Sequence, residues 1–91
     1  MLLENKIAIV TGAGKGLGAA IAHALILKNC TVYGISRNKE NLALLREKLG
    51  SNFHSVELDI TDEPAITQWA SKTFSSSYIP NILINNAGIG S

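Results

Sequence analysis

A row of glycines directly after a short apolar run constrains the fold of this chain more than any other feature. The run Lys6–Val10 contains several β-branched residues, which is typical of a strand buried on both faces. Gly12, Gly14, Gly16 and Gly18 occupy alternate positions just beyond it. Apolar residues then recur at helical spacing, so we predict a strand, a glycine turn and a helix.

The helix after the turn is predicted to pack along one side only. His23 and Lys28 fall on the side that faces water, and Asn29 is suited to the left-handed conformation in which helices often end. The residues predicted to pack against the rest of the fold are Leu17, Ala20, Ile21, Ala24 and Leu25.

A glycine turn at the start of a helix can bind an anion. Glycines adopt backbone angles that other residues avoid, and without side chains they let a ligand approach the free N–H groups of the first helical turn. The helix dipole also favours negative charge there. The turn therefore predicts a bound pyrophosphate, although the same pattern also occurs in tight turns without a ligand.

The spacing of the glycines separates several nucleotide-binding folds. An ATPase-type loop needs a glycine five residues before its Gly-Lys pair and a Ser or Thr after it, but Ile9 and Gly16 stand at those positions. Residues 14–18 also match the Gly-x-Gly-x-Gly of methyltransferases that bind S-adenosylmethionine. Those enzymes typically have an acid at the end of the next strand, where this chain has Ser36 and Arg37. A methyltransferase is therefore a remote alternative.

The composition fits one small globular domain and argues against several classes of function. Of 91 residues, 46% are hydrophobic and 16% are charged, and the formal net charge is +1. This charge provides no basic surface for nucleic acid or an anionic membrane. No apolar run approaches the ~20 residues of a membrane span, and the first residues do not resemble a secretory signal. We therefore expect a cytoplasmic protein without nucleic-acid or membrane partners.

No metal site is predicted. The single cysteine, Cys30, allows no internal disulfide and is better suited to filling buried space. His23 and His54 have no partners at the spacing of metal ligands, so structural roles are favoured for both.

Strands alternate with helices along the chain, which predicts a parallel sheet with helical crossovers. After the first strand, further strands are expected over residues 31–36, 53–58 and 82–84, the last of them buried. Right-handed crossovers give the spatial order 3-2-1-4 with three helices, an α/β, Rossmann-like doubly wound sheet that is only partly present. Ligands of such sheets bind beyond the carboxyl ends of the strands, between strands 1 and 4.

Capping residues mark the ends of the later helices. Asn38 is a candidate N-cap for the second helix, and Gly50 is placed to end it. Thr61 or Asp62 can cap the third helix.

The end of the second strand predicts which dinucleotide binds. In dinucleotide-binding folds an acid about 20 residues after the glycines bonds the ribose of NAD, but Arg37 stands at this position. Arg37 and Lys15 could instead grip the 2′-phosphate of NADP(H), unless both are merely solvated surface charges. The hydroxyl of Ser36 could reach the same phosphate or cap the following turn. We therefore favour NADP(H) over NAD(H).

The chain resembles the short-chain dehydrogenases/reductases over essentially its whole length. Thr11-Gly12 followed by Gly16 and Gly18 resembles their Thr-Gly-x-x-x-Gly-x-Gly turn, and Asn85-Asn86-Ala87-Gly88 resembles a second family segment. The resemblance implies that Asp59 contacts the adenine amino group, that Ile60 offers a backbone contact, and that the Asn-Asn-Ala-Gly segment braces the sheet and borders the cofactor ribose. The expected cofactor-binding residues are Gly12, Gly14, Lys15, Gly16, Leu17, Gly18, Ser36, Arg37, Asp59, Ile60, Asn86, Ala87 and Gly88.

The family's catalytic residues are expected outside this sequence. They are a serine, and a tyrosine four residues before a lysine, but Arg37 follows Tyr33 at that spacing and Ile82 follows Tyr78. Residues 1–91 are thus expected to be the N-terminal part of a dinucleotide-binding domain without its C-terminal catalytic part. The resemblance implies an oxidoreductase, homo-oligomeric at full length, that transfers hydride between nicotinamide and a carbonyl or secondary alcohol. The alternatives are a non-catalytic dinucleotide-binding regulatory module and an inactive truncated fragment.

Overall fold

The fold is a parallel sheet that separates two helices from a third. The computed structural model describes residues 3–86. Its elements, in chain order, are β1 (Ile7–Thr11), α1 (Gly16–Leu27), β2 (Thr31–Ser36), α2 (Lys39–Leu49), β3 (Phe53–Glu57), α3 (Glu63–Thr73) and β4 (Ile82–Asn85).

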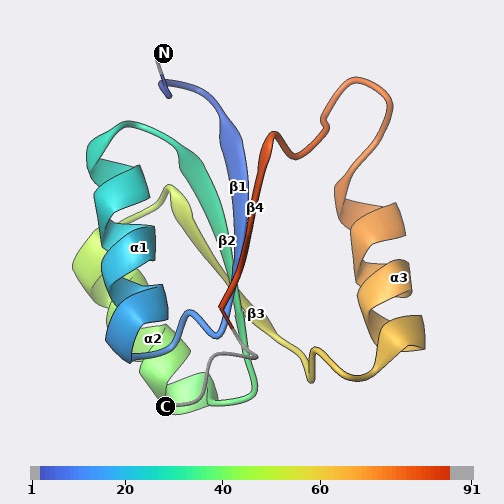
Figure 1. The fold of residues 1–91 in the computed structure, drawn as a ribbon, viewed down its shortest axis with the longest axis horizontal. Coiled ribbons are helices and arrows are strands. Elements are labelled where there is room, and N and C mark those ends of the chain that lie inside the picture. Colours follow the sequence, from blue (N-terminus) through green and yellow to red (C-terminus); the bar gives the residue numbers. More distant parts are fainter. Residues whose placement is uncertain (1–2, 87–91) are drawn as a thin grey trace.

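The strands lie in the order β3-β2-β1-β4, all parallel, as the sequence predicted. In the centre of the sheet Ile9 lies opposite Tyr33 on one side and Leu83 on the other. Helices α1 and α2 cover one face of the sheet, and α3 lies on the opposite face (Figure 1). Because all four strands are parallel, their carboxyl ends lie on one side of the molecule. The order of the strands reverses between β1 and β4.

The main core lies between the sheet and the pair α1 and α2. Phe53 fills the space over β2, where a Cβ at Gly34 would overlap its ring and lie 3.0 Å from the Cβ of Ala13. Gly34 is therefore required for this close packing. The cluster of buried side chains comprises Ala8, Val10, Ala13, Ala22, Cys30, Val32, Leu42, Leu45 and Phe53.

The predicted packing side of α1 is partly wrong. Leu17 is 58% exposed, and Ala20 and Ala24 are exposed as well, whereas Gly18 and Ala22 are buried. Because α1 is apolar on nearly all sides, periodicity alone does not select the inner one. The inward side carries Gly18 and Ala22, and these small residues let the helix approach the sheet closely. The other residues of the prediction are half-buried against the core: Ile21 and Leu25.

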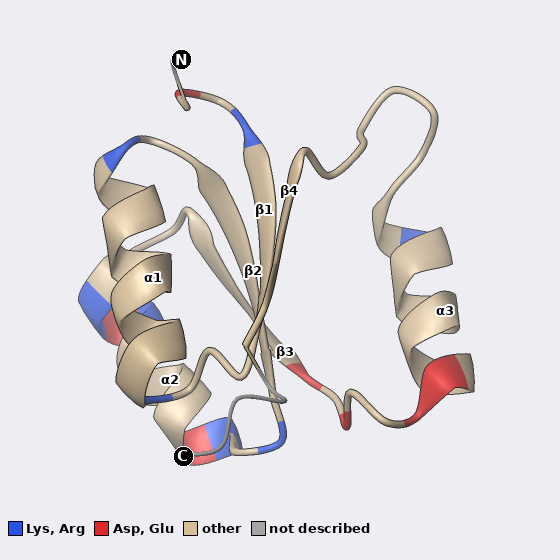
Figure 2. Ribbon diagram, in the orientation of Figure 1, with Lys and Arg blue, Asp and Glu red and all other residues tan. Residues whose placement is uncertain are grey.

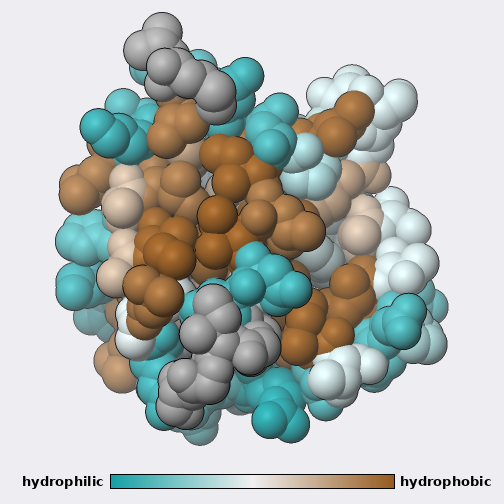
Figure 3. Space-filling model, viewed as in Figure 1, coloured by the Kyte–Doolittle hydropathy of each residue, from teal (hydrophilic) through white to brown (hydrophobic). Residues whose placement is uncertain are grey.

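The face that carries α3 is packed less completely. No residue of α3 is buried, and it is held by a group of aromatic rings around Tyr33. β4 was predicted to be buried, but Leu83 on this face is 67% exposed, so the prediction is wrong for that side of the strand. Only Ile82 and Ile84, on the other side, pack against the core. Figure 3 shows apolar surface over α1 and β4.

The predicted capping residues are confirmed. Asn38 accepts the Asn41 N–H at 2.9 Å, and Gly50 ends α2 with a φ of 90°. Asp62, rather than Thr61, caps α3 by accepting the Ala65 N–H at 3.2 Å. These local bonds satisfy donors at the helix starts that packing leaves free.

Candidate functional site

A cavity of about 630 Å³ opens at the carboxyl ends of β1, β2 and β3. This is the place where ligands of doubly wound sheets bind, and the volume is within the usual range for small-molecule sites. Its walls are the glycine turn, the β2–α2 and β3–α3 connections, the first turn of α2 and the start of the segment after β4. The lining residues are Gly12, Gly14, Lys15, Gly16, Leu17, Ile35, Ser36, Arg37, Asn38, Asn41, Leu58, Asp59, Ile60, Thr61 and Asn86.

The glycine turn leaves room for a ligand in the cavity. Gly12 and Gly16 have φ values of 64° and 61°, which side chains other than that of glycine rarely allow. Among the described residues, nothing lies within 4 Å of a Cβ placed at Gly16, so they leave the space beside it open. At Gly14 a Cβ would lie 3.1 Å from Ser36 Oγ and 3.2 Å from Asn41 Cβ, so this glycine packs the turn against β2 and α2.

Among residues 3–86, no side chain caps the start of α1. Its N-cap, Lys15, makes no side-chain capping hydrogen bond, and no acidic residue lies in the first turn. Within the part of the chain that the structure describes, the backbone N–H groups there have no side-chain cap of the kind found at the starts of α2 and α3. Together with the helix dipole, such N–H groups form a site for phosphate oxygens.

Polar contacts between β1 and β4 hold the glycine turn in place. The Asn86 N–H donates to Thr11 Oγ1 at 2.9 Å, and Thr11 Oγ1 lies 3.0 Å from Asn85 Oδ1. The side-chain amide of Asn86 donates to the Gly12 carbonyl at 3.3 Å. A Cβ at Gly18 would overlap that carbonyl, so Gly18 lies beneath the turn and lets α1 approach it. These contacts fix the turn relative to the sheet.

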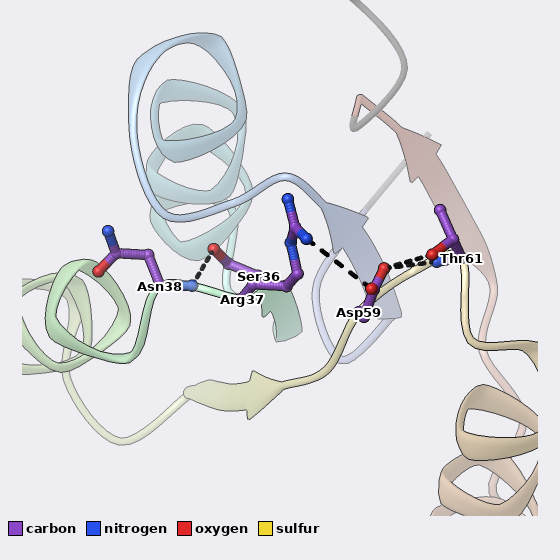
Figure 4. Close-up of polar contacts among 5 residues, drawn as sticks. All are labelled: Ser36, Arg37, Asn38, Asp59 and Thr61. Carbon is purple, nitrogen blue, oxygen red and sulfur yellow. Dashed lines mark hydrogen bonds and ion pairs between the residues drawn. The ribbon is translucent and has the colours of Figure 1, made fainter.

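Charged side chains of both signs meet at this end of the sheet. Figure 2 shows basic residues in the glycine turn and the β2–α2 connection, and acidic residues along the β3–α3 connection. Arg37 Nη1 lies 3.8 Å from Asp59 Oδ2, and both side chains are substantially exposed. The oxygen Oδ1 of Asp59 accepts hydrogen bonds from Thr61 N at 2.9 Å and Thr61 Oγ1 at 2.7 Å (Figure 4). These bonds, and secondarily Arg37, hold the pKa of Asp59 below its usual value.

The hydroxyl of Ser36 supports the β2–α2 connection. Its oxygen accepts the Asn38 N–H at 3.0 Å, so the capping role that the sequence left open is present in the structure (Figure 4). Ser36 also lines the cavity beside Arg37. The hydroxyl can therefore serve both the turn and a ligand.

Most of the predicted site residues lie together. Of the thirteen, only Gly18 lies outside the lining among residues 3–86, and Ala87 and Gly88 fall outside the described residues. Five further residues line the cavity but were not predicted from the sequence: Ile35, Asn38, Asn41, Leu58 and Thr61. No sequence motif predicts a role for Asn41. It lines the cavity because α2 packs beside Gly14.

The described part of the chain contains no group of His, Cys, Asp or Glu side chains arranged to bind a metal ion. His54 instead stacks on Tyr33, with ring centroids 4.7 Å apart. Within the same residues no helix has the length and apolar character needed to cross a membrane.

Comparisons with known proteins find relatives over almost the whole chain. It is 39% identical over 89 residues to the 3-oxoacyl-[acyl-carrier-protein] reductase FabG of Vibrio harveyi, covering 98% of this chain and 36% of that protein. It is 37% identical to the farnesol dehydrogenase of Aedes aegypti, covering 93% of this chain and 36% of that enzyme. The chain therefore spans little more than a third of the length of these relatives.

A solved structure shares the fold. The serine dehydrogenase of Escherichia coli superposes with a TM-score of 0.82 at 31% identity, covering 93% of this chain and 39% of that one. The description of the matching sequence family is "short chain dehydrogenase", and the match extends over residues 6–91. The chain belongs to the short-chain dehydrogenase family.

Proposed function

We propose that the chain is the N-terminal, cofactor-binding part of an NADP(H)-dependent short-chain oxidoreductase. The observation that carries this proposal is the position of Lys15 and Arg37 on two different walls of one cavity. The end of β2 carries no acid, and the acid across the cavity, Asp59, is paired with Arg37. Two cations beside the end of β2 suit a 2′-phosphate and give NAD(H) no corresponding advantage.

The residues of the cavity fit such a cofactor. The uncapped start of α1 and the open space beside Gly16 suit the pyrophosphate. Arg37, Lys15 and Ser36 suit the 2′-phosphate. On the opposite wall Asp59 and Ile60 suit the adenine ring. We assign a contact with the cofactor ribose to Asn86, Ala87 and Gly88.

When bound, NADP(H) would supply or accept a hydride. This chain's own residues would bind and orient it, since no tyrosine precedes a lysine by four residues in this sequence. We propose that the acid–base groups and the substrate loops lie in a C-terminal part, as the greater length of the relatives suggests. The substrate would be a carbonyl compound or a secondary alcohol, and the full-length protein would be a homo-oligomer.

Reversing the charge of Arg37 tests this function. Arg37→Asp replaces a phosphate partner by a repelling charge, so the affinity for NADPH should fall about 10- to 100-fold. The affinity for NADH should change by about threefold or less, because NADH has no 2′-phosphate. Dissociation constants of both cofactors, measured on the purified protein by fluorescence titration, provide the comparison.

Arg46→Asp is the matched control. Arg46 lies in the last turn of α2, outside the cavity, and the substitution makes the same change in net charge. It should leave both dissociation constants nearly unchanged. Equal losses of NADPH and NADH affinity in Arg37→Asp would contradict the assignment of NADP(H).

A further inference from the structure

We propose that Asp59 tunes the affinity for the 2′-phosphate by competing with it for Arg37. This inference rests on the proposed function of the cavity. In the structure Arg37 Nη1 lies 3.8 Å from Asp59 Oδ2, on a line that crosses from the β2–α2 connection to the β3–α3 connection (Figure 4). Binding of a 2′-phosphate would draw the guanidinium away from Asp59.

The two partners differ in how firmly they are held. Both hydrogen bonds from Thr61 end on Oδ1 of Asp59, and they leave Oδ2 to face Arg37. The side chain of Arg37 is 78% exposed, against 42% for that of Asp59. Asp59 is therefore the fixed partner, positioned by Thr61, and Arg37 is the partner that moves.

The contact is weak enough to be exchanged. A separation of 3.8 Å is beyond the 2.7–2.9 Å typical of a charge-assisted hydrogen bond, and exposed ion pairs contribute little to stability. A phosphate carries more negative charge than a carboxylate and presents several oxygens to the planar guanidinium. The phosphate would therefore displace Asp59 from Arg37. The affinity for the phosphate would be lower by the interaction free energy of the Arg37–Asp59 pair.

Asp59→Asn separates this competition from other effects. The amide keeps the size of the side chain and an oxygen that can accept the Thr61 bonds, but it loses the negative charge. The loss of an exposed ion pair corresponds to about a two- to fivefold gain in affinity for a ligand that needs Arg37 free. Binding of adenosine 2′,5′-bisphosphate should tighten by this factor, and binding of 5′-AMP should not.

A double-mutant cycle with Arg37→Ala assigns the effect to the pair. Calorimetry would measure both nucleotides on the full-length protein and on the variants Asp59→Asn, Arg37→Ala and the double mutant. We expect Asp59→Asn to tighten bisphosphate binding only where Arg37 is present. Glu57→Gln is the control, because Glu57 ends the neighbouring strand β3 and its loss makes the same change in net charge outside the cavity.

The remaining outcomes overturn the inference in recognisable ways. Equal tightening with and without Arg37 would show direct repulsion of the phosphate by Asp59, and tightening by Glu57→Gln would show a general charge effect. Unchanged or weaker binding in Asp59→Asn would mean that Asp59 does not compete for Arg37. If the unmodified protein bound the bisphosphate no better than 5′-AMP, the proposed NADP(H) site would fail, and the inference with it.

Discussion

A phenylalanine ring packs on each face of the sheet, but the two rings are buried to different degrees. On the face covered by α1 and α2, Phe53 is fully buried against Gly34. On the face covered by α3, Phe74 is only half-buried and meets Tyr33 edge to face, with ring centroids 5.3 Å apart. One face is closed by interlocking aliphatic and aromatic side chains. The other is held mainly by contacts between rings.

This difference indicates which face of the sheet supports the conformation of the candidate site. The glycine turn continues directly from β1 into α1, and Ala13 within it belongs to the buried cluster. The Ala13 N–H also donates to the Ile35 carbonyl at 3.2 Å. The glycine turn is thus part of the tightly packed face, whereas α3 touches the candidate site only through the connection that carries Asp59 and Thr61.

Removing the Phe53 ring should have the largest effect. Phe53→Ala would open a cavity in the closed core and lower the free energy of unfolding by about 3–5 kcal/mol. Urea-induced unfolding, followed by circular dichroism, measures the loss. Since such a loss can unfold a small domain outright, Phe53→Leu provides a milder variant, with an expected loss of about 1–3 kcal/mol. A loss below that of the matching Phe74 variants would contradict the proposed difference between the faces.

The same substitution on the α3 face should cost less. Phe74→Ala removes ring contacts with Tyr33, Trp69 and Tyr78 from a half-buried position. We expect the free energy of unfolding to fall by about 1–2 kcal/mol. The measurement is again urea-induced unfolding, with Phe74→Leu compared with Phe53→Leu. A loss as large as that of Phe53→Ala would show that the ring cluster is as tightly packed as the main core.

The smallest effect on the free energy of unfolding is expected for Tyr33→Phe, and its pH dependence should appear in the alkaline range. The Tyr33 hydroxyl lies 2.8 Å from that of Tyr78, and burial, followed by this contact, raises the pKa of Tyr33 from 10.0 to about 12. The unfolded chain loses this proton first, so the stabilisation is complete below pH 10 and is lost as the pH rises towards 12. Tyr33→Phe should remove this part of the alkaline decline, and at neutral pH it should cost about 1 kcal/mol or less.

Unfolding free energies measured across this pH range test the prediction. The absorbance of tyrosinate, followed in the folded protein, reports the ionisation directly. Ionisation of Tyr33 near its ordinary value of 10.0, or an identical alkaline decline in Tyr33→Phe, would contradict it.

The order of the elements could be predicted from the sequence because local signals agree with the fold. Asn38 and Asp62 cap helices, Gly50 ends one, and Asn29 adopts a φ of 67°. These residues act through their own backbone neighbours, so a single sequence reveals them. The strand order then follows from the handedness of the crossovers.

The side on which an element packs was harder to predict. Leu17 is apolar but exposed, because Gly18 beside it is the residue that must approach the turn. Leu83 is exposed, and the rings that hold α3 gather instead around Tyr33 of β2. Both positions depend on contacts between elements distant in sequence, which periodicity does not encode.

The candidate site also has features that follow from local sequence and features that depend on contacts between distant elements. That Lys15 and Arg37 line the cavity could be predicted from their spacing relative to the glycines, because this spacing fixes where the strand and the helix end. The ion pair between Arg37 and Asp59, and the two bonds from Thr61, join connections that follow different strands. These contacts cannot be predicted from spacing in the sequence, because they form only when the two connections come together in the fold.

The dissociation constants of NADPH and NADH for the unmodified protein test the assigned cofactor most directly. Both would be measured on one preparation of the full-length protein at a single ionic strength, because contacts with phosphate weaken as salt rises. We expect NADPH to bind about tenfold more tightly than NADH or better, through the contact of its 2′-phosphate with Arg37 and Lys15. Equal affinities, or tighter binding of NADH, would contradict the assignment of these two cations to the 2′-phosphate.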